Sequence, residues 1–113
     1  MNDLKSMSCT QPKIGGPSLS MSEIEGYRPQ IPDWDIIEIE GVNRLVRQFM
    51  FKNFVKALEF TTRIGELAEQ EDHHPSILTE WGKVTISWWT HAVEGLHLND
   101  FICAAKSDQV YLS

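Results

Sequence analysis

A change in the spacing of apolar residues divides the middle of this chain into strands, a helix and strands again. Residues 34–40 and 44–51 alternate apolar and polar side chains on either side of a glycine-containing turn, which is typical of a β-hairpin. Apolar residues then recur at three- and four-residue steps over residues 54–68, and Asn53 before them is a favourable N-cap. The pattern predicts a long amphipathic helix that ends near Glu69.

A second alternating stretch follows this helix. Residues 77–81 and 84–91 lie on either side of a glycine-lysine turn, which predicts another hairpin. We expect His91 to end the second strand of that hairpin. A final helix is expected to begin at His97 or Asn99.

The N-terminal part of the chain combines a segment without an apolar period and a short helix. Residues 1–19 hold glycines, prolines and small hydroxyl residues, so little burial offsets the entropy of ordering them, and we predict a flexible tail. Ser20 or Ser22 can cap a helix that runs through Tyr27, and Pro29 must stop it.

The predicted order of elements is helix, two strands, helix, two strands, helix. Two hairpins joined by a helix favour a four-stranded antiparallel sheet with the helices packed on one face, so we assign the chain to the α+β class. Residues 20–113 form the predicted domain, and a chain of 113 residues is long enough for one hydrophobic core.

Composition excludes several classes of function. Sixteen acidic against ten basic residues give a net charge of -6, which opposes direct binding to nucleic acid or anionic lipid. No apolar run approaches the roughly 18 residues that a bilayer requires. The first residues lack a basic region followed by an apolar stretch, so we expect no secretory signal and a cytoplasmic protein. Cys9 and Cys103 lie far apart in sequence, and we expect both to be free thiols.

Two adjacent histidines before a proline follow the predicted central helix. Histidine titrates near neutral pH, with an ordinary pKa of about 6.5, and Pro75 favours an extended backbone at His74. The pair should therefore lie where the helix stops. Adjacent side chains of an extended segment point to opposite sides, and the chain has neither His-x-x-x-His nor Cys-x-x-Cys. We therefore expect no metal site.

The residues alone leave two interpretations of these histidines open. His73 and His74 can occupy a polar turn while His91 is hydrogen-bonded at a strand end. Alternatively, acid–base catalysis needs two proton carriers on opposite sides of a substrate, and His73 or His74 could lie on one side with His91 on the other. Nucleophilic catalysis has little support, because no serine lies in a Gly-x-Ser-x-Gly turn.

A spaced set of residues surrounds the histidines. It consists of Glu69, His73-His74-Pro75, Trp81, His91 and Asp100. These residues and their spacing resemble the signature of the pterin-4a-carbinolamine dehydratase family. Residues 49–54 and 57–64 also resemble that family's second strand and central helix, and the resemblance covers about residues 20–110.

The resemblance implies an enzyme that uses neither a metal nor an organic cofactor. Members of the family remove water from 4a-hydroxytetrahydrobiopterin, the product of aromatic amino acid hydroxylases, and give quinonoid dihydrobiopterin, which allows tetrahydrobiopterin to be recycled. The implied catalytic residues are His73, His74 and His91; the implied pterin-binding segments are His73-His74-Pro75 and Thr90-His91-Ala92-Val93; the implied supporting residues are Glu69, Trp81 and Asp100.

We hypothesise that His74 and His91 carry two proton transfers, while His73 positions the pterin or serves the other face of its ring. Which histidine is the acid is left open. Asp100 can orient His91 or act as a favourable carboxylate in the first turn of the last helix. Trp81 is expected to pack around the site.

The resemblance also implies an alternative function. Some members of the family bind a helical dimerisation segment of a transcription factor, and others resemble assembly chaperones, so a non-catalytic interaction protein is the second hypothesis. The intact set of three histidines favours the enzyme, because a scaffold does not need it.

We expect a homodimer or homotetramer, since open sheet edges can join. Glu69 can support the site or be a solvated charge, and His97, outside the spaced set, is expected to be a surface or capping residue.

Overall fold

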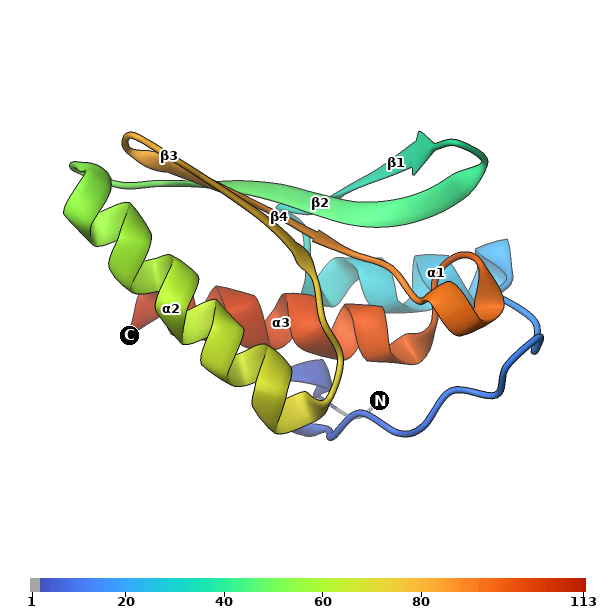
Figure 1. Cartoon of the computed structure of the whole chain (residues 1–113). Helices are drawn as coiled ribbons and strands as arrows, with labels where there is room; N and C mark the ends of the chain where they lie inside the picture. The colour runs from blue at the N-terminus through green and yellow to red at the C-terminus, as the bar shows by residue number, and fades with distance from the viewer. Residues whose placement is uncertain (1–2) are drawn as a thin grey trace.

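The structure, a computed structural model, describes residues 3–113 and shows one four-stranded sheet with helices against one face (Figure 1). The predicted α+β class and order of elements are confirmed. Among the described residues, every helix is too short or too polar to cross a lipid bilayer. The elements are 3-10 turns at Leu4–Ser6, Arg28–Gln30 and His91–Val93; helices α1 (Met21–Tyr27), α2 (Phe54–Glu71) and α3 (Leu98–Leu112); and strands β1 (Asp35–Ile39), β2 (Val42–Met50), β3 (Ser76–Glu80) and β4 (Lys83–Trp88).

The two predicted hairpins join through their second strands. The order in the sheet is β1-β2-β4-β3 with every neighbouring pair antiparallel, so β1 and β3 form the edges. Leu45 of β2 pairs with Ile36 and Trp88 on its two sides, and both Leu45 and Trp88 are buried beneath the helices. Because side chains alternate across a strand, Ile37 and Leu78 face the other way and are 41% and 55% exposed. One face of the sheet therefore covers the core and the other is open.

Each α-helix begins after a residue whose side chain accepts a backbone hydrogen bond. Ser20 forms a capping box at the start of α1, and Asn53 accepts from the first turn of α2. His97 precedes α3, and its ring accepts from the Asn99 N–H at 3.0 Å. These caps were predicted, and His97 is confirmed as a capping residue. The helix α1 also ends just before Pro29, as expected.

Aromatic rings fill the space between the sheet and the two long helices. The ring of Phe49 in β2 lies 5.8 Å from that of Trp34 and 4.7 Å from that of Phe60 in α2, measured between centroids. Tyr111, near the end of α3, contacts the same ring at 5.0 Å. Burying a side chain such as Phe49 stabilises the fold by about 1.5–3 kcal/mol. This packing fixes the positions of α2 and α3 relative to the sheet. It therefore also fixes the positions of the helix ends, where polar residues lie.

One predicted strand is too long. Alternation extends to His91 in the sequence, but β4 ends at Trp88 and His91 begins a 3-10 turn. The Thr90 N–H donates to the Gly95 carbonyl at 2.9 Å, and the Thr90 carbonyl accepts from the Gly95 N–H, so the backbone closes a local loop. Glu94, in the left-handed region with φ 50°, completes that loop. The predicted strand end at His91 is wrong, because alternation does not report where hydrogen bonding to the neighbouring strand stops.

The N-terminal segment runs past the end of α2 and along α3 (Figure 1). Leu4 is wholly buried, and its N–H donates to Gln30 Oε1 at 2.8 Å. The Gly15 N–H donates to the Ala92 carbonyl at 2.8 Å. We predicted a flexible tail over residues 1–19, of which the first two lie outside the described residues. The prediction concerns motion, which these contacts do not measure, so it stays a prediction.

The two cysteines meet where this segment crosses α3. Both are free, as expected, and Cys9 Sγ lies 3.4 Å from Cys103 Sγ. The contact with the Cys9 thiol and then burial raise the pKa of the Cys103 thiol. Since the thiolate is the reactive form, a raised pKa lowers reactivity at any pH below it.

We expect iodoacetamide at pH 8 to label Cys103 at least about tenfold more slowly in the folded chain than in the chain unfolded by guanidinium, because one unit of pKa corresponds to a tenfold change in thiolate. Peptide mass spectrometry at timed intervals measures both rates. Equal rates for Cys103 in the two states would contradict the expectation.

Candidate active site

A cavity of about 450 Å³ lies beside the C-terminal end of α2 and the loop after β4. Cavities of this size are common for small-molecule sites. Three segments line it: residues 9–12, 71–74 and 89–92. The structure therefore brings His73, His74 and His91 to one cavity.

His73 and His74 reach the cavity because α2 ends immediately before them. Asp72 adopts the left-handed conformation with φ 52°, and the His73 N–H donates to the Ala68 carbonyl at 3.1 Å, which closes the helix. Pro75 then leads into β3. The prediction that the histidine pair lies where a helix stops is confirmed.

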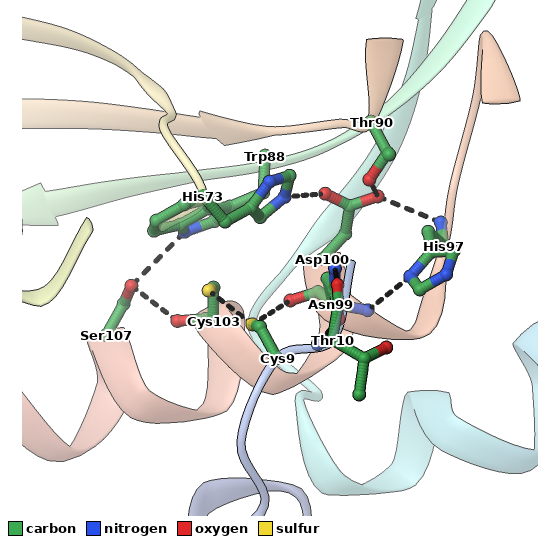
Figure 2. A network of polar contacts seen from close by, with 10 residues as sticks. All are labelled: Cys9, Thr10, His73, Trp88, Thr90, His97, Asn99, Asp100, Cys103 and Ser107. Atoms are coloured by element: carbon green, nitrogen blue, oxygen red, sulfur yellow. Dashed lines mark hydrogen bonds and ion pairs between the residues drawn. The ribbon is translucent and has the colours of Figure 1, made fainter. Parts of the chain in front are cut away.

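The His73 ring is held by two neighbours (Figure 2). Its Nε2 lies 2.6 Å from Oδ1 of Asp100, and the ring stacks on Trp88 with centroids 5.3 Å apart and planes inclined by 24°. Only 11% of the His73 side chain is exposed. A ring enclosed in this way has one orientation, with one nitrogen committed to a carboxylate.

Asp100 is a wholly buried carboxylate with three partners. Besides His73, its Oδ2 accepts from the Thr90 hydroxyl at 2.8 Å and from the His97 N–H at 2.9 Å. Figure 2 shows these contacts converging on the first turn of α3. Of the two roles considered from the sequence, the first-turn carboxylate is observed. The histidine that Asp100 orients is His73, so the expectation that it orients His91 is wrong.

His74 points to a more exposed partner. Its Nε2 lies 2.5 Å from Oε2 of Glu69, with 58% of the His74 side chain and 77% of the Glu69 side chain exposed. An ion pair with this exposure contributes at most about 1 kcal/mol. Glu69 does not itself line the cavity, so its contact with the site passes through His74.

His91 approaches the cavity from the 3-10 turn after β4. Its ring lies edge-on to Trp89, with centroids 5.3 Å apart and an interplanar angle of 62°. The guanidinium of Arg44, in β2, lies 3.9 Å from the centroid of the same Trp89 ring, within the range of cation–π attraction. The His91 side chain is exposed and is placed by contact with Trp89.

The other residues implied by the resemblance differ in position. Thr90 and Ala92 line the cavity, whereas Pro75 and Val93 do not. Trp81 is 74% exposed in the turn between β3 and β4, at the end of β4 remote from Trp88. Within this chain the expectation that Trp81 packs around the site is wrong, because the length of a strand separates it from the histidines.

Several cavity residues were missed from the sequence. Glu71, Asp72 and Trp89 adjoin predicted residues, and their nearness in sequence was the available signal. Trp88 supports His73 from the core side, and its inward place in the alternation of β4 was readable. Residues 9–12 carried no such signal, because nothing local indicates which surface an irregular segment crosses.

Two of the three histidines at the site are hydrogen-bonded to carboxylates. Among residues 3–113, no three His, Cys, Asp or Glu side chains are arranged to hold a metal ion. Asp100 and Glu69 each hold one histidine instead. The arrangement can orient imidazoles toward a small molecule and move protons to or from it.

Comparison with known proteins assigns the class. Residues 17–110 match the family described as pterin 4 alpha carbinolamine dehydratase. The chain belongs to this family, and the dehydratase class of enzyme implied by the resemblance of the spaced residue set is confirmed.

Individual relatives agree with this assignment. A protein of Syntrophotalea carbinolica named "Putative pterin-4-alpha-carbinolamine dehydratase" is 54% identical over 108 residues, which cover 96% of each chain. A protein of the same name from Nitrosococcus oceani is 53% identical over 110 residues, 97% of each chain. Among solved structures, a "transcriptional coactivator/pterin dehydratase from Brucella Melitensis" superposes with a TM-score of 0.73 at 27% identity, covering 82% of this chain and 97% of that one.

Proposed function

We propose that this chain dehydrates 4a-hydroxytetrahydrobiopterin to quinonoid dihydrobiopterin by general acid–base catalysis with histidines. The observation that carries the proposal is that His73, His74 and His91, from the end of α2 and the loop after β4, line one cavity. Membership in a dehydratase family supports the same reaction.

The reaction removes the C4a hydroxyl group and the N5 hydrogen as water. One imidazolium gives a proton to the hydroxyl group as the C4a–O bond breaks, and the N5 electron pair forms the C4a=N5 double bond. A neutral imidazole then takes the proton from N5. Hydroxide is a poor leaving group at neutral pH, so each proton transfer contributes about 10²- to 10⁴-fold to the rate.

We assign the two transfers to His74 and His91, and a positioning role against the pterin to His73. Supporting this division, only 11% of the His73 side chain is exposed, its Nε2 is held by the buried Asp100 and its ring is packed on Trp88. By contrast, the Glu69 side chain that contacts His74 is 77% exposed. His74 and His91 are more exposed and lie on separate elements, as two groups on different sides of a substrate require. The pH profiles of variants at these two positions distinguish acid from base.

The test is a direct assay of the purified chain. 4a-Hydroxytetrahydrobiopterin is mixed with protein in a stopped-flow instrument, and the absorbance of the quinonoid product is followed against the same solution without protein. We expect dehydration to be faster with protein and to saturate with substrate. A rate equal to the uncatalysed rate at every protein concentration would overturn the proposal.

The proposed physiological role is recycling of tetrahydrobiopterin beside an aromatic amino acid hydroxylase, which supplies the carbinolamine. A hydroxylase working with substoichiometric pterin and a quinonoid dihydropterin reductase should sustain turnover longer when this chain is added. If adding this chain does not prolong turnover by the hydroxylase, the proposed link to a hydroxylase is wrong.

We further propose that the chain forms a homo-oligomer. The open sheet face carries exposed Ile37, Ile39 and Leu78, and the edge strands β1 and β3 have unpaired backbone groups. Light scattering after gel filtration should give the mass of a dimer or tetramer, and a monomer at micromolar concentration would contradict this.

A pull-down from source cells beside the dehydratase assay tests the alternative role of an interaction protein.

A further inference from the structure

The cavity has a wall that the spaced histidine motif does not include. Residues 9–12 of the N-terminal segment line it together with His73, His74 and His91. Two backbone hydrogen bonds attach this segment to other residues that line the cavity. The Cys9 N–H donates to Oε1 of Glu71 at 2.9 Å, and the Gly15 N–H donates to the Ala92 carbonyl at 2.8 Å. The segment thus links the end of α2 to the loop after β4, the two elements that carry the histidines.

The same turn of α3 holds this wall and the His73 ring (Figure 2). Asn99, which is 2% exposed, accepts from the Thr10 N–H at 3.0 Å and donates its amide to the Thr10 carbonyl at 2.7 Å. The next residue, Asp100, holds His73. Because consecutive residues of one helix make both attachments, the wall and the ring keep a fixed relation to each other.

The wall offers polar groups suited to a pterin. Gln11 is exposed and lines the cavity, and its amide provides donors and an acceptor. The pyrimidine edge of a pterin presents an amino group and a carbonyl on either side of a ring N–H, and the biopterin side chain carries hydroxyl groups, so either can pair with an amide. Small-molecule sites are commonly oriented by a few polar groups of this kind.

We propose that residues 9–12 form a wall of the pterin-binding site and that the Gln11 amide hydrogen-bonds the substrate and fixes its orientation. This inference rests on the proposed dehydration of a pterin at the same cavity. It assigns Gln11 to binding and not to proton transfer, because a carboxamide donates and accepts hydrogen bonds but does not ionise near neutral pH. Removing the amide should therefore weaken binding and leave the chemical step intact.

The experiment compares Gln11→Ala with Lys13→Ala. Lys13 is an exposed neighbour in the same segment that does not line the cavity, so its substitution is a matched control. For Gln11→Ala we expect KM to rise about tenfold with kcat within about twofold of the parent, as loss of one hydrogen bond to a ligand predicts. The Kd for 7,8-dihydrobiopterin, measured by calorimetry without turnover, should rise by a similar factor, and Lys13→Ala should match the parent.

Two substrates identify the group that Gln11 contacts. If the pyrimidine edge is bound, the loss in Gln11→Ala is equal for substrates with the dihydroxypropyl side chain and with a methyl group at C6. If the side chain is bound, only the hydroxylated substrate shows the loss. Parent values of KM and Kd in Gln11→Ala for both substrates overturn this inference and leave the dehydratase intact. A parent chain that neither binds nor dehydrates the pterin overturns the proposed function and this inference with it.

Discussion

The His91→Ala variant is expected to dehydrate 4a-hydroxytetrahydrobiopterin about 10²- to 10⁴-fold more slowly than the parent chain, and so is His74→Ala. Both rings line the cavity, and both are more exposed than His73, whose Nε2 is bound to Asp100. Alanine removes the proton carrier and leaves the backbone of the loop or helix end in place. The loss should therefore fall on the rate constant of the chemical step, measured by single-turnover stopped-flow.

A histidine outside the cavity provides the control. His97 caps α3 and is absent from the cavity lining, and asparagine is also a favourable N-cap. His97→Asn should retain the parent kcat. Circular dichroism should give the parent spectrum for all three variants. If His74→Ala and His91→Ala both dehydrate at the parent rate, the assignment of proton transfer to these residues is wrong.

The Asp100→Ala variant should lose about 3 kcal/mol of unfolding free energy, because one substitution leaves three donors, one buried and two partly buried, without their acceptor. These donors are the His73 ring, the Thr90 hydroxyl group and the His97 N–H. Activity should fall as well, since an imidazole without its carboxylate is no longer fixed in one orientation. Urea unfolding followed by tryptophan fluorescence measures the first effect.

Two further substitutions separate the contributions at Asp100. Thr90→Val removes one donor and leaves the carboxylate with two partners, so we expect a loss of about 1 kcal/mol. Asp100→Asn keeps the shape of the side chain, so its stability should lie between those of the parent and of Asp100→Ala. It also provides a measurement if the alanine variant does not fold. An Asp100→Ala variant with the parent urea midpoint would show that the buried carboxylate does not support the fold.

Local signals in the sequence located most of the elements. Asn53 and the three- and four-residue period after it predicted α2, and the proline after His73-His74 predicted that this pair follows a helix end. Such signals act within one turn of helix or one hairpin. They are therefore readable without knowledge of the tertiary packing.

The contacts that complete the site were not readable in the same way. His73 and Asp100 are 27 positions apart, and their meeting depends on how α2 and α3 pack beneath the sheet. Asp100 was accordingly paired with the wrong histidine. Trp81 matched the spacing of the resemblance, but spacing does not state the end of a strand at which a residue lies, and the hairpin carries it away from the cavity.

The attachment of Thr10 to Asn99 joins positions 89 apart, and Cys9 meets Cys103 across 94. During synthesis both hairpins and α2 are available before α3, so all three histidines exist in a growing chain that still lacks the turn holding the His73 ring and the N-terminal wall. A partly synthesised chain thus contains all three histidines before the contacts that enclose the cavity can form. We therefore expect ligand binding at this cavity to be acquired last, when α3 and residues 9–12 come into contact.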